Sequence, residues 1–312
     1  MGVENPVVQS DGNLPAIILR SFKPGDEAIL TEILNGAFRG LEFLPRAKAA
    51  LSSPYFNREA SLLAEEDGSP KGLIAVFNLP RSNWFEIRFL AVRDALRRRE
   101  IAEKLAAKVI GDVESEHPEY LKATTLAVQP YVDIYKTAGF LPVRRTIRMV
   151  WDLSASRPGI PADMTIQGMP LERFQEAVAV FIEGLRPYWN WFIQEWNGPE
   201  ALAGTFTAPT EKDHGWICSV DQGKITGIAW LLPNYYSPGV ARFQGVYVPP
   251  DLRQKGIGSA LMDAMLARAR DLDQTKLVIY TFAYLDHFAP AVLLYLKSGG
   301  RIEAEYLQLQ KF

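Results

Sequence analysis

The chain has 312 residues, of which 48% are hydrophobic and 22% charged, and its formal net charge is −2 at pH 7. This length predicts two domains, each able to bury its own core, and the small net charge argues against a general binder of nucleic acid or other polyanions. Cys218 is the only cysteine, so an intramolecular disulfide is excluded, and three scattered histidines with one cysteine give no metal signature.

The first half predicts a mixed sheet with helices on its faces. Its polar start, residues 1–13, has no signal-peptide core, and no apolar run in the chain reaches membrane-spanning length, so we expect a cytoplasmic protein without membrane contact. The strands expected from β-branched and aromatic runs are Ile17–Arg20, Ser61–Glu66, Lys71–Leu79, Phe85–Val92, Thr125–Val128 and Val143–Trp151. The helices expected from apolar spacing are Asp26–Phe38, Leu96–Val113 and Val132–Ala138, and Asp26 is placed to cap the first of them.

The second half repeats this order after a stretch rich in Ser, Pro and Gly near Ser154–Pro161. Its expected strands are Thr165–Gln167, Trp216–Val220, Lys224–Leu232, Ala241–Val248, Lys276–Phe282 and Arg301–Leu309. Its expected helices are Leu171–Leu185, Gly258–Ala269 and Ala289–Lys297. The predicted fold class is therefore α/β, with a twisted mixed sheet flanked by helices in each half.

The two halves also match in sequence. Val92 to Arg97 can be aligned with Val248 to Arg253, which pairs Arg97 with Arg253, 156 positions later. Tyr135 is paired with Tyr295, 160 positions later, and each tyrosine precedes a glycine by four residues. Two matches at nearly one offset predict a tandem of related domains, residues 1–153 and 154–312.

A basic, glycine-containing loop, Arg253-Gln254-Lys255-Gly256-Ile257-Gly258, opens a helix of the second half. It follows a strand that Pro249 and Pro250 end, because proline lacks a backbone donor. A helix start offers free N–H groups and a positive dipole end to a phosphate, and Arg253 and Lys255 add charge. A Walker A loop is excluded because no Gly-Lys-Ser/Thr ending is present, and a dinucleotide fingerprint fits poorly without a third glycine. Glycines at a helix start are also common as turn residues.

This order of strand, proline stop, basic loop and helix resembles the R-x-x-G-x-G/A pyrophosphate loop of the GNAT superfamily of acyl-CoA-dependent N-acyltransferases. The resemblance is close over Val246–Leu261 and weaker through Phe312. It implies two GNAT-like domains, acetyl-CoA as co-substrate, and an N-acetyltransferase that moves an acetyl or other acyl group to an amine by direct attack in a ternary complex. The cofactor contacts that it implies are Val246, Tyr247, Val248, Arg253, Gln254, Lys255, Gly256, Ile257, Gly258, Ser259 and Ala260.

The same resemblance implies a catalytic residue. Tyr295 falls where the family places a tyrosine that protonates the departing CoA thiolate, and the alternative is a tyrosine packed at a helix end. Backbone groups of Val246–Val248 are implied to pair with the pantetheine arm like an added strand. Gly245 is either the bulge that opens this slot or an ordinary strand irregularity. The chain departs from the family where Gly300 replaces the usual Phe, where the helix-start Asn is absent, and where Gln244 stands in place of a strand Glu.

The acceptor side is less specified. Candidates for the general base are Glu183, Glu195, Asp286 and His287, and a water chain is also possible. The aromatic stretch Pro187–Trp196 either clamps an apolar, aromatic or cationic acceptor or is buried between the two domains. Further candidates for the rim are Tyr235, Tyr236 and Tyr284.

The first half is predicted to be a degenerate copy with a structural or substrate-shaping role. Glu100 stands where the second half has Gly256, and a carboxylate there would repel a pyrophosphate. One cofactor is therefore expected per chain, although weak binding through Arg97 and Arg99 is the alternative. The run Arg97–Arg99 also fits a solvated helix face as well as it fits RNA.

Two functions remain open. The first is the enzyme described above, acting on a small-molecule or peptide amine, and the second is a non-catalytic acyl-CoA sensor or partner-binding pseudoenzyme. We expect a monomer with an internal pseudo-dimer, in which the two sheets are related by an approximate twofold or by a close side-by-side contact, or a homodimer.

Overall fold

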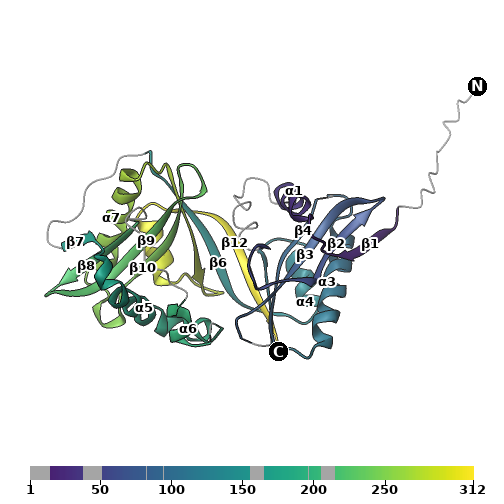
Figure 1. Ribbon diagram of the computed structural model, residues 1–312, viewed down its shortest axis with the longest axis horizontal. Coiled ribbons are helices and arrows are strands. Elements are labelled where there is room, and N and C mark those ends of the chain that lie inside the picture. The colour runs from purple at the N-terminus through teal and green to yellow at the C-terminus, as the bar shows by residue number, and fades with distance from the viewer. Residues whose placement is uncertain are drawn as a thin grey trace, which may run out of the picture.

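The computed structural model describes residues 15–37, 51–81, 83–93, 95–154, 165–195, 197–204 and 215–312, without the side chains of residues 186–195, 200 and 202. Within these ranges the strands form one sheet of 12 strands, with helices on its faces (Figure 1). Every strand and helix predicted from the sequence is present at or close to its predicted position.

The first half contains six strands and three described helices. The strands are β1 (Ile17–Ser21), β2 (Phe56–Glu66), β3 (Ser69–Asn78), β4 (Trp84–Val92), β5 (Tyr120–Leu126) and β6 (Leu141–Asp152). The helices are α1 (Glu27–Ala37), α3 (Arg98–Ser115) and α4 (Tyr131–Thr137). The helix α3 buries an apolar face of alternating aliphatic and alanine side chains, which is the pattern that predicted it.

The second half repeats this arrangement with a longer first helix, of 22 residues against 11 in α1. The strands are β7 (Thr165–Gly168), β8 (Trp216–Asp221), β9 (Lys224–Ser237), β10 (Val240–Tyr247), β11 (Lys276–Ala283) and β12 (Arg301–Lys311). The helices are α5 (Phe174–Glu195), α6 (Pro199–Gly204), α7 (Ile257–Asp271) and α8 (Pro290–Lys297), with 3-10 turns at η1 (Leu171–Arg173) and η2 (Pro250–Leu252). The sequence did not predict α6, and α5 continues ten residues past the predicted end at Leu185.

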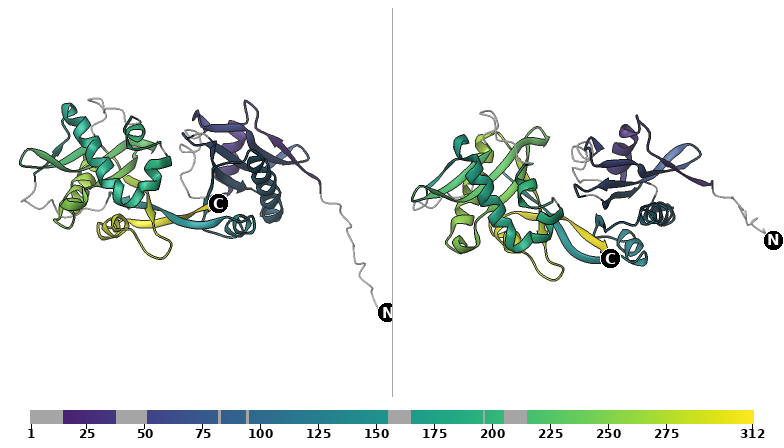
Figure 2. Two further views of the ribbon diagram at one scale, coloured as in Figure 1. Left: turned by 90° about the horizontal axis from the view of Figure 1, so that it is seen from below. Right: turned by 60° about the horizontal axis from the view of Figure 1, so that its bottom comes forward.

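The last strand of each half lies in the other half. The strand order is β1-β2-β3-β4-β5-β12-β6-β11-β10-β9-β8-β7, so β12 pairs with β5, β6 pairs with β11, and the two exchanged strands pair with each other. Figures 1 and 2 show β6 and β12 side by side between the two lobes. The sequence did not predict this exchange, which joins both halves in one sheet and leaves no free strand edge at the centre. Equivalent strands follow one another in the same order from either end of the sheet, as an approximate twofold relation between the halves requires.

Each half has a parallel strand pair that separates partway along its length. In the first half β4 pairs with β5 only over Trp84–Ile87, and in the second half β10 pairs with β11 only over Val240–Arg242. Beyond these residues the two strands of each pair are no longer hydrogen-bonded to each other. The separation leaves backbone groups at the end of β4 and of β10 that face no neighbouring strand of the pair.

The cores follow the exchange. One apolar cluster fills the first half, and a second lies beneath α7 and α8 in the second half. Three side chains of β6, Ile147, Met149 and Trp151, belong to the second cluster. The first half thus supplies part of the interior of the second half.

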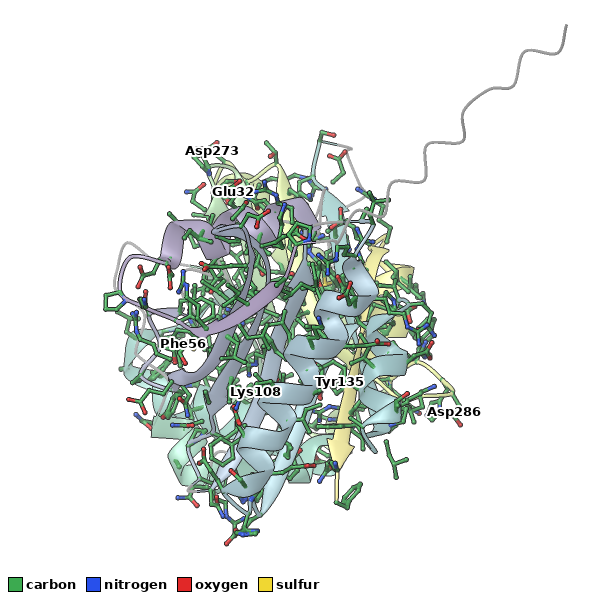
Figure 3. The ribbon with its side chains drawn as sticks, turned by 90° about the vertical axis from the view of Figure 1, so that its right-hand side faces the viewer. Glu32, Phe56, Lys108, Tyr135, Asp273 and Asp286 are labelled. Carbon is green, nitrogen blue, oxygen red and sulfur yellow. The ribbon has the colours of Figure 1, made fainter. Side chains whose placement is uncertain are left out.

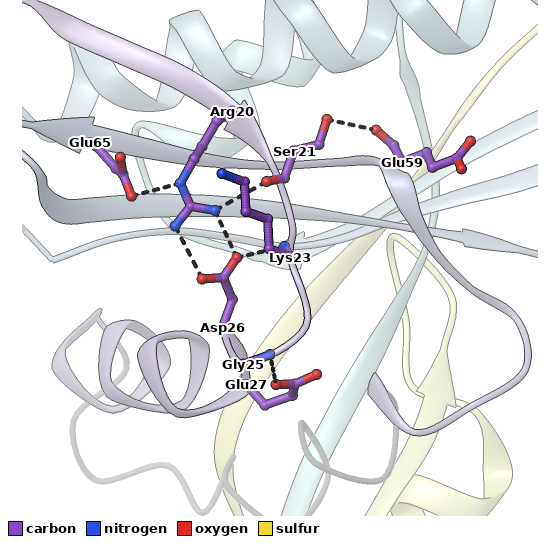
Figure 4. A network of polar contacts seen from close by, with 8 residues as sticks. All are labelled: Arg20, Ser21, Lys23, Gly25, Asp26, Glu27, Glu59 and Glu65. Carbon is purple, nitrogen blue, oxygen red and sulfur yellow. Dashed lines mark hydrogen bonds and ion pairs between the residues drawn. The ribbon is translucent and has the colours of Figure 1, made fainter.

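The junction of β1 and α1 is fixed by a polar network (Figure 4). Arg20 donates to both oxygens of Asp26 at 2.7 and 3.1 Å and to Glu65 at 2.8 Å, and Asp26 also accepts the N–H of Lys23. The side chain of Asp26 therefore orders the loop before α1, whereas the sequence had suggested a cap on the helix itself. The hydrogen bond from Arg20 holds the pKa of Asp26 below its usual value.

No helix in the described part of the chain is both long enough and apolar enough to cross a membrane.

Candidate functional site

The loop before α7 has the backbone geometry of an open anion site. Gln254 and Gly256 have positive φ angles of 61° and 83°, and Gly256 occupies the N-cap position of α7 without a side-chain hydrogen bond to the first turn. The N–H groups of the first turn are therefore not satisfied by a cap. Gln254, Lys255, Gly256 and Ser259 are exposed, whereas the side chains of Ile257 and Ala260 are buried in the core. Ile257 can therefore contact a ligand only through its backbone. The predicted contact at Ala260 is not supported, because its side chain is buried and its N–H donates to the carbonyl of Gly256 at 3.0 Å.

The side chain of Arg253 donates hydrogen bonds to two backbone carbonyls next to this loop. Its Nε donates to the carbonyl of Val248 at 3.0 Å, and one terminal nitrogen donates to the carbonyl of Gly184 at 2.8 Å. A Cβ atom on Gly184 would lie 3.1 Å from Cβ of Tyr247, so α5 passes very close to β10 at this point. Arg253 thus ties α5 to the end of β10, and Lys255 is the exposed cation of the loop.

The strand β10 has a register shift at Gly245. The pairing with β9 shifts between Phe243 and Gly245, and Gly245 has a φ angle of 124°. Only glycine adopts this backbone conformation easily. The shift lies where β10 has left β11, at the glycine for which the sequence left a bulge and an ordinary irregularity open.

Tyr295 lies at this open part of β10. Its side chain is 2% exposed, and its hydroxyl accepts the N–H of Val246 at 3.2 Å. Burial raises the pKa of Tyr295 to about 12, against the opposite effect of the hydrogen bond from Val246. Because the hydroxyl oxygen accepts from the backbone, its own proton is available to another acceptor.

The ring of Tyr295 is packed between two aromatic rings. Phe243 of β10 lies 5.7 Å away and Trp151 of β6 lies 5.6 Å away, both edge to face. Gly300, which replaces the family's Phe, leaves the space that the indole of Trp151 fills, since a Cβ atom on Gly300 would lie 2.8 Å from that ring. The sequence shows the glycine, but the tryptophan that fills its space lies on a strand of the other half and could not be predicted.

The matching loop of the first half is closed. In the alignment of the two halves, α3 begins at the residue that corresponds to Gln254. The residues of the first half that correspond to the open loop are therefore helical. Arg97 makes two 2.9 Å hydrogen bonds to Glu100, and it also bonds Glu66 and the carbonyl of Pro15. The hydrogen bonds from Arg97 lower the pKa of Glu100 to about 2, so this carboxylate is charged. Arg99 is paired with Glu103, which places it in a solvated ion pair on the helix surface.

The slot of the first half is also filled. Phe89 occupies the position of the register shift in β4 with a φ of 57°, and the Tyr131 hydroxyl bonds the backbone of Val92. Tyr135, the counterpart of Tyr295, is fully buried, and its hydroxyl has no hydrogen-bond partner among the described residues (Figure 3). At β4 the backbone of Val92 is thus hydrogen-bonded to a tyrosine, and the hydroxyl of Tyr135 is enclosed.

The described candidates for the base are all exposed. Glu183 is exposed on α5, and Asp286 and His287 form an exposed 2.7 Å pair in the loop between β11 and α8. The side chains of the aromatic stretch Pro187–Trp196, with Glu195 among them, lie outside the described residues. Gln244 lies on β10, and its backbone carbonyl accepts a hydrogen bond from the Tyr247 hydroxyl at 2.8 Å.

The three rim candidates differ in their surroundings. The hydroxyl of Tyr235 accepts from Arg242 at 2.9 Å, Tyr236 is buried in a small apolar cluster, and Tyr284 stacks on His287 at 4.3 Å. Within the described ranges, no group of three His, Cys, Asp or Glu side chains is arranged to hold a metal ion.

Comparisons with known proteins agree with this geometry. The family model described as "Acetyltransferase (GNAT) family" matches residues 180–299, and that described as "Acetyltransferase (GNAT) domain" matches residues 41–151. Together the two matches cover most of the chain, one in each half. No curated protein sequence matches the chain.

Solved structures match over nearly the whole chain. A GCN5-related N-acetyltransferase from Sphaerobacter thermophilus has a TM-score of 0.73 at 16% identity, with 95% of each chain covered. A tandem GNAT protein from the clavulanic acid biosynthesis pathway has a TM-score of 0.62 at 13% identity, covering 95% of this chain and 98% of its own. A glucosamine N-acetyltransferase region of a fungal multi-domain β-N-acetylglucosaminidase has a TM-score of 0.67 at 10% identity, covering 95% of this chain and 38% of that protein. At these identities the likeness concerns the fold.

Proposed function

Because the chain belongs to the GNAT acetyltransferase family as a tandem of two of its domains, we propose that its second half transfers an acetyl group from acetyl-CoA to an amine acceptor. The attack is direct, within a ternary complex, and one acetyl-CoA binds per chain. The observation that carries the proposal is the coincidence, in one half, of an uncapped helix start, a separated strand and a buried tyrosine bonded to that strand.

The residues of the second half fit the proposed co-substrate. The N–H groups around Lys255–Ser259 would hold the pyrophosphate, because the helix start is uncapped and the left-handed backbone at Gln254 and Gly256 keeps these donors out of the helix ladder. Lys255 would add a positive charge, and Arg253 would hold the loop against α5. Acetyl-CoA supplies an activated thioester when bound.

The strand β10 would orient the reacting end. Backbone groups of Tyr247 and Val248 lie along the part of β10 that β11 leaves unpaired, where an extended ligand arm can add as a strand. The N–H of Val246 is bonded to Tyr295, so it positions the phenol. The Tyr295 Oη would donate its proton to the leaving sulfur, and burial keeps the phenol protonated at neutral pH.

The test is a pair of measurements on the full chain. Calorimetry with acetyl-CoA should give one site per chain, and incubation with a panel of small-molecule and peptide amines should release free thiol with one class of amine. Two equivalent sites would contradict the assignment to the second half. Binding without thiol release for any amine would favour an acyl-CoA sensor, for which the amide Gln244 at the strand position of the family's Glu is the supporting observation.

A further inference from the structure

A tryptophan from the first half lies inside the second half, next to the proposed acid. Trp151 is the last apolar residue of β6, pairs with Leu277 of β11 and is 2% exposed. Its ring is 5.6 Å from Tyr295 and 5.9 Å from Phe243, in edge-to-face geometry with both. The exchanged strand therefore completes an aromatic cage around the phenol.

The first half solves the same packing problem with its own residue. Phe140, at the position of Gly300, lies 5.5 Å from Tyr135, which nearly equals the distance from Trp151 to Tyr295. The exchanged strand β12 brings Lys311 to the register position that Trp151 has on β6, and the Lys311 ammonium lies 6.0 Å from the Phe140 ring. One tyrosine is thus packed by a ring from its own half, and the other by a ring from the opposite half.

Trp151 also holds the backbone of Tyr295. Its indole Nε1 donates to the hydroxyl of Ser298 at 3.1 Å, and that hydroxyl donates to the carbonyl of Tyr295 at 2.8 Å. The other end of the tyrosine is fixed by the N–H of Val246. Trp151 thus contacts the ring of Tyr295 directly and its backbone through Ser298, while Val246 fixes the hydroxyl.

We propose that Trp151 is a positioning residue for Tyr295, through which the first half takes part in acyl transfer by the second. The inference rests on the proposed function, because it assigns to Tyr295 the role of proton donor. Trp151 touches neither substrate nor the reacting sulfur in this account. It holds the phenol at the angle where the hydroxyl meets β10, and it keeps water from the space that Gly300 leaves.

The first experiment is a double-mutant cycle. Trp151→Ala should lower kcat by about ten- to a hundredfold, as small displacements of a catalytic group do, with little change in acetyl-CoA affinity. In a Tyr295→Phe background the same substitution should have no further effect on kcat, because the group that it positions is gone. Equal losses of kcat in both backgrounds would overturn the proposal.

The second experiment transplants the arrangement of the first half. Gly300→Phe alone should be destabilising, because its Cβ atom would lie 2.8 Å from the Trp151 indole and 2.9 Å from the carbonyl of Tyr295. Combined with Trp151→Ala, which removes the first of these contacts, it should restore part of the lost kcat, since a ring then lies beside Tyr295 as Phe140 lies beside Tyr135. If Trp151→Ala does not fold, Trp151→Phe supplies the cycle, because it keeps a ring and removes only the donor to Ser298. A folded double variant without recovered kcat would count against the proposal.

A readout without turnover separates this inference from the proposed function. The N–H of Val246, followed by amide exchange, should exchange faster in Trp151→Ala and slow again in the Trp151→Ala/Gly300→Phe variant. Trp84→Phe, in the tryptophan of β4 that stacks on Tyr120 in the first half, is the control and should leave both Val246 exchange and kcat unchanged. Unchanged exchange in Trp151→Ala would refute the positioning role, whereas changed exchange without any acyl transfer would refute only the proposed function.

Discussion

The two halves share one fold and differ at the start of a single helix. In the second half, α7 begins after Gly256 with a left-handed residue and no cap, whereas in the first half α3 begins about one turn earlier and its loop cation is bonded to two carboxylates. The same strand register shift, with positive φ, precedes both loops. The difference teaches that an open, uncapped helix start is lost by winding one more helical turn, while the register shift of the preceding strand is retained.

A second difference explains why the closed half remains useful. The first half gives up its last strand to the second, and that strand carries Trp151 to Tyr295 and Arg145 to the loop before α8. Arg145 donates to the carbonyl of Tyr284 at 2.8 Å and lies over the ring of Phe288. The closed half thus supports the open one through packing and hydrogen bonds, and it needs no ligand of its own to do so.

The largest expected effect comes from Gly256→Glu, which gives the second half the residue that the first half has at the aligned position. The added carboxylate would face the pyrophosphate, and like charges in contact cost several kcal/mol, so acetyl-CoA affinity should fall on the order of a thousandfold. Calorimetry measures the loss. Gly223→Glu in the β8–β9 turn is the control, because Gly223 also has a positive φ of 77° with open space around it. Equal loss of affinity in both variants would show a general effect of strain and charge.

The next prediction concerns the two tyrosines. Tyr295→Phe should lower kcat about a hundredfold, the lower end of the range for a positioned acid, because a thiolate is a stable leaving group. Acetyl-CoA affinity should stay within a few fold, since only one oxygen is removed. Tyr135→Phe should leave kcat unchanged. A loss of turnover in Tyr135→Phe as large as that in Tyr295→Phe would contradict the separate roles of the two halves.

Much of this comparison follows from the sequence. The proline stop, the glycines of the loop and the apolar spacing predicted β10, the loop and α7, and the repeat predicted the tandem. These features are local, so turn chemistry and periodicity determine them. Position along the chain also placed Tyr295 near β10, and the structure adds the bond to Val246.

The strand exchange could not be predicted, because the alternation of apolar residues in β6 fits the core of either half equally well. The pairing is specified by contacts far apart in sequence, such as the buried ion pair of Arg148 on β6 with Glu303 on β12. The bonds of Arg253 escaped prediction for the same reason, since their acceptor Gly184 lies on another helix. One signal was available: Gly300 in place of a Phe meant a missing ring that another segment had to replace.

A smaller effect separates the tyrosines by stability. The Tyr135 hydroxyl is buried without a hydrogen-bond partner in the described part of the chain, so Tyr135→Phe should raise the free energy of unfolding by up to about 1 kcal/mol. Tyr295→Phe should lower it by about 1 kcal/mol, because it leaves the N–H of Val246 without the oxygen that accepts it. Urea unfolding of both variants measures the two changes, and changes of the same sign would contradict the contrast between their surroundings.

The smallest expected effect is none at all. Glu100→Gly removes the carboxylate that most visibly distinguishes the first loop from the second, yet we expect calorimetry still to give one acetyl-CoA site per chain. The reason is that the substitution does not unwind the first turn of α3, and it leaves Arg97 bonded to Glu66 and to the carbonyl of Pro15. The hydroxyl of Tyr131 would also remain on the backbone of Val92, where an added ligand strand would have to bond. A second site in Glu100→Gly would mean that charge alone closes the first half; a single site would mean that the helix start, the arginine and the filled slot close it together.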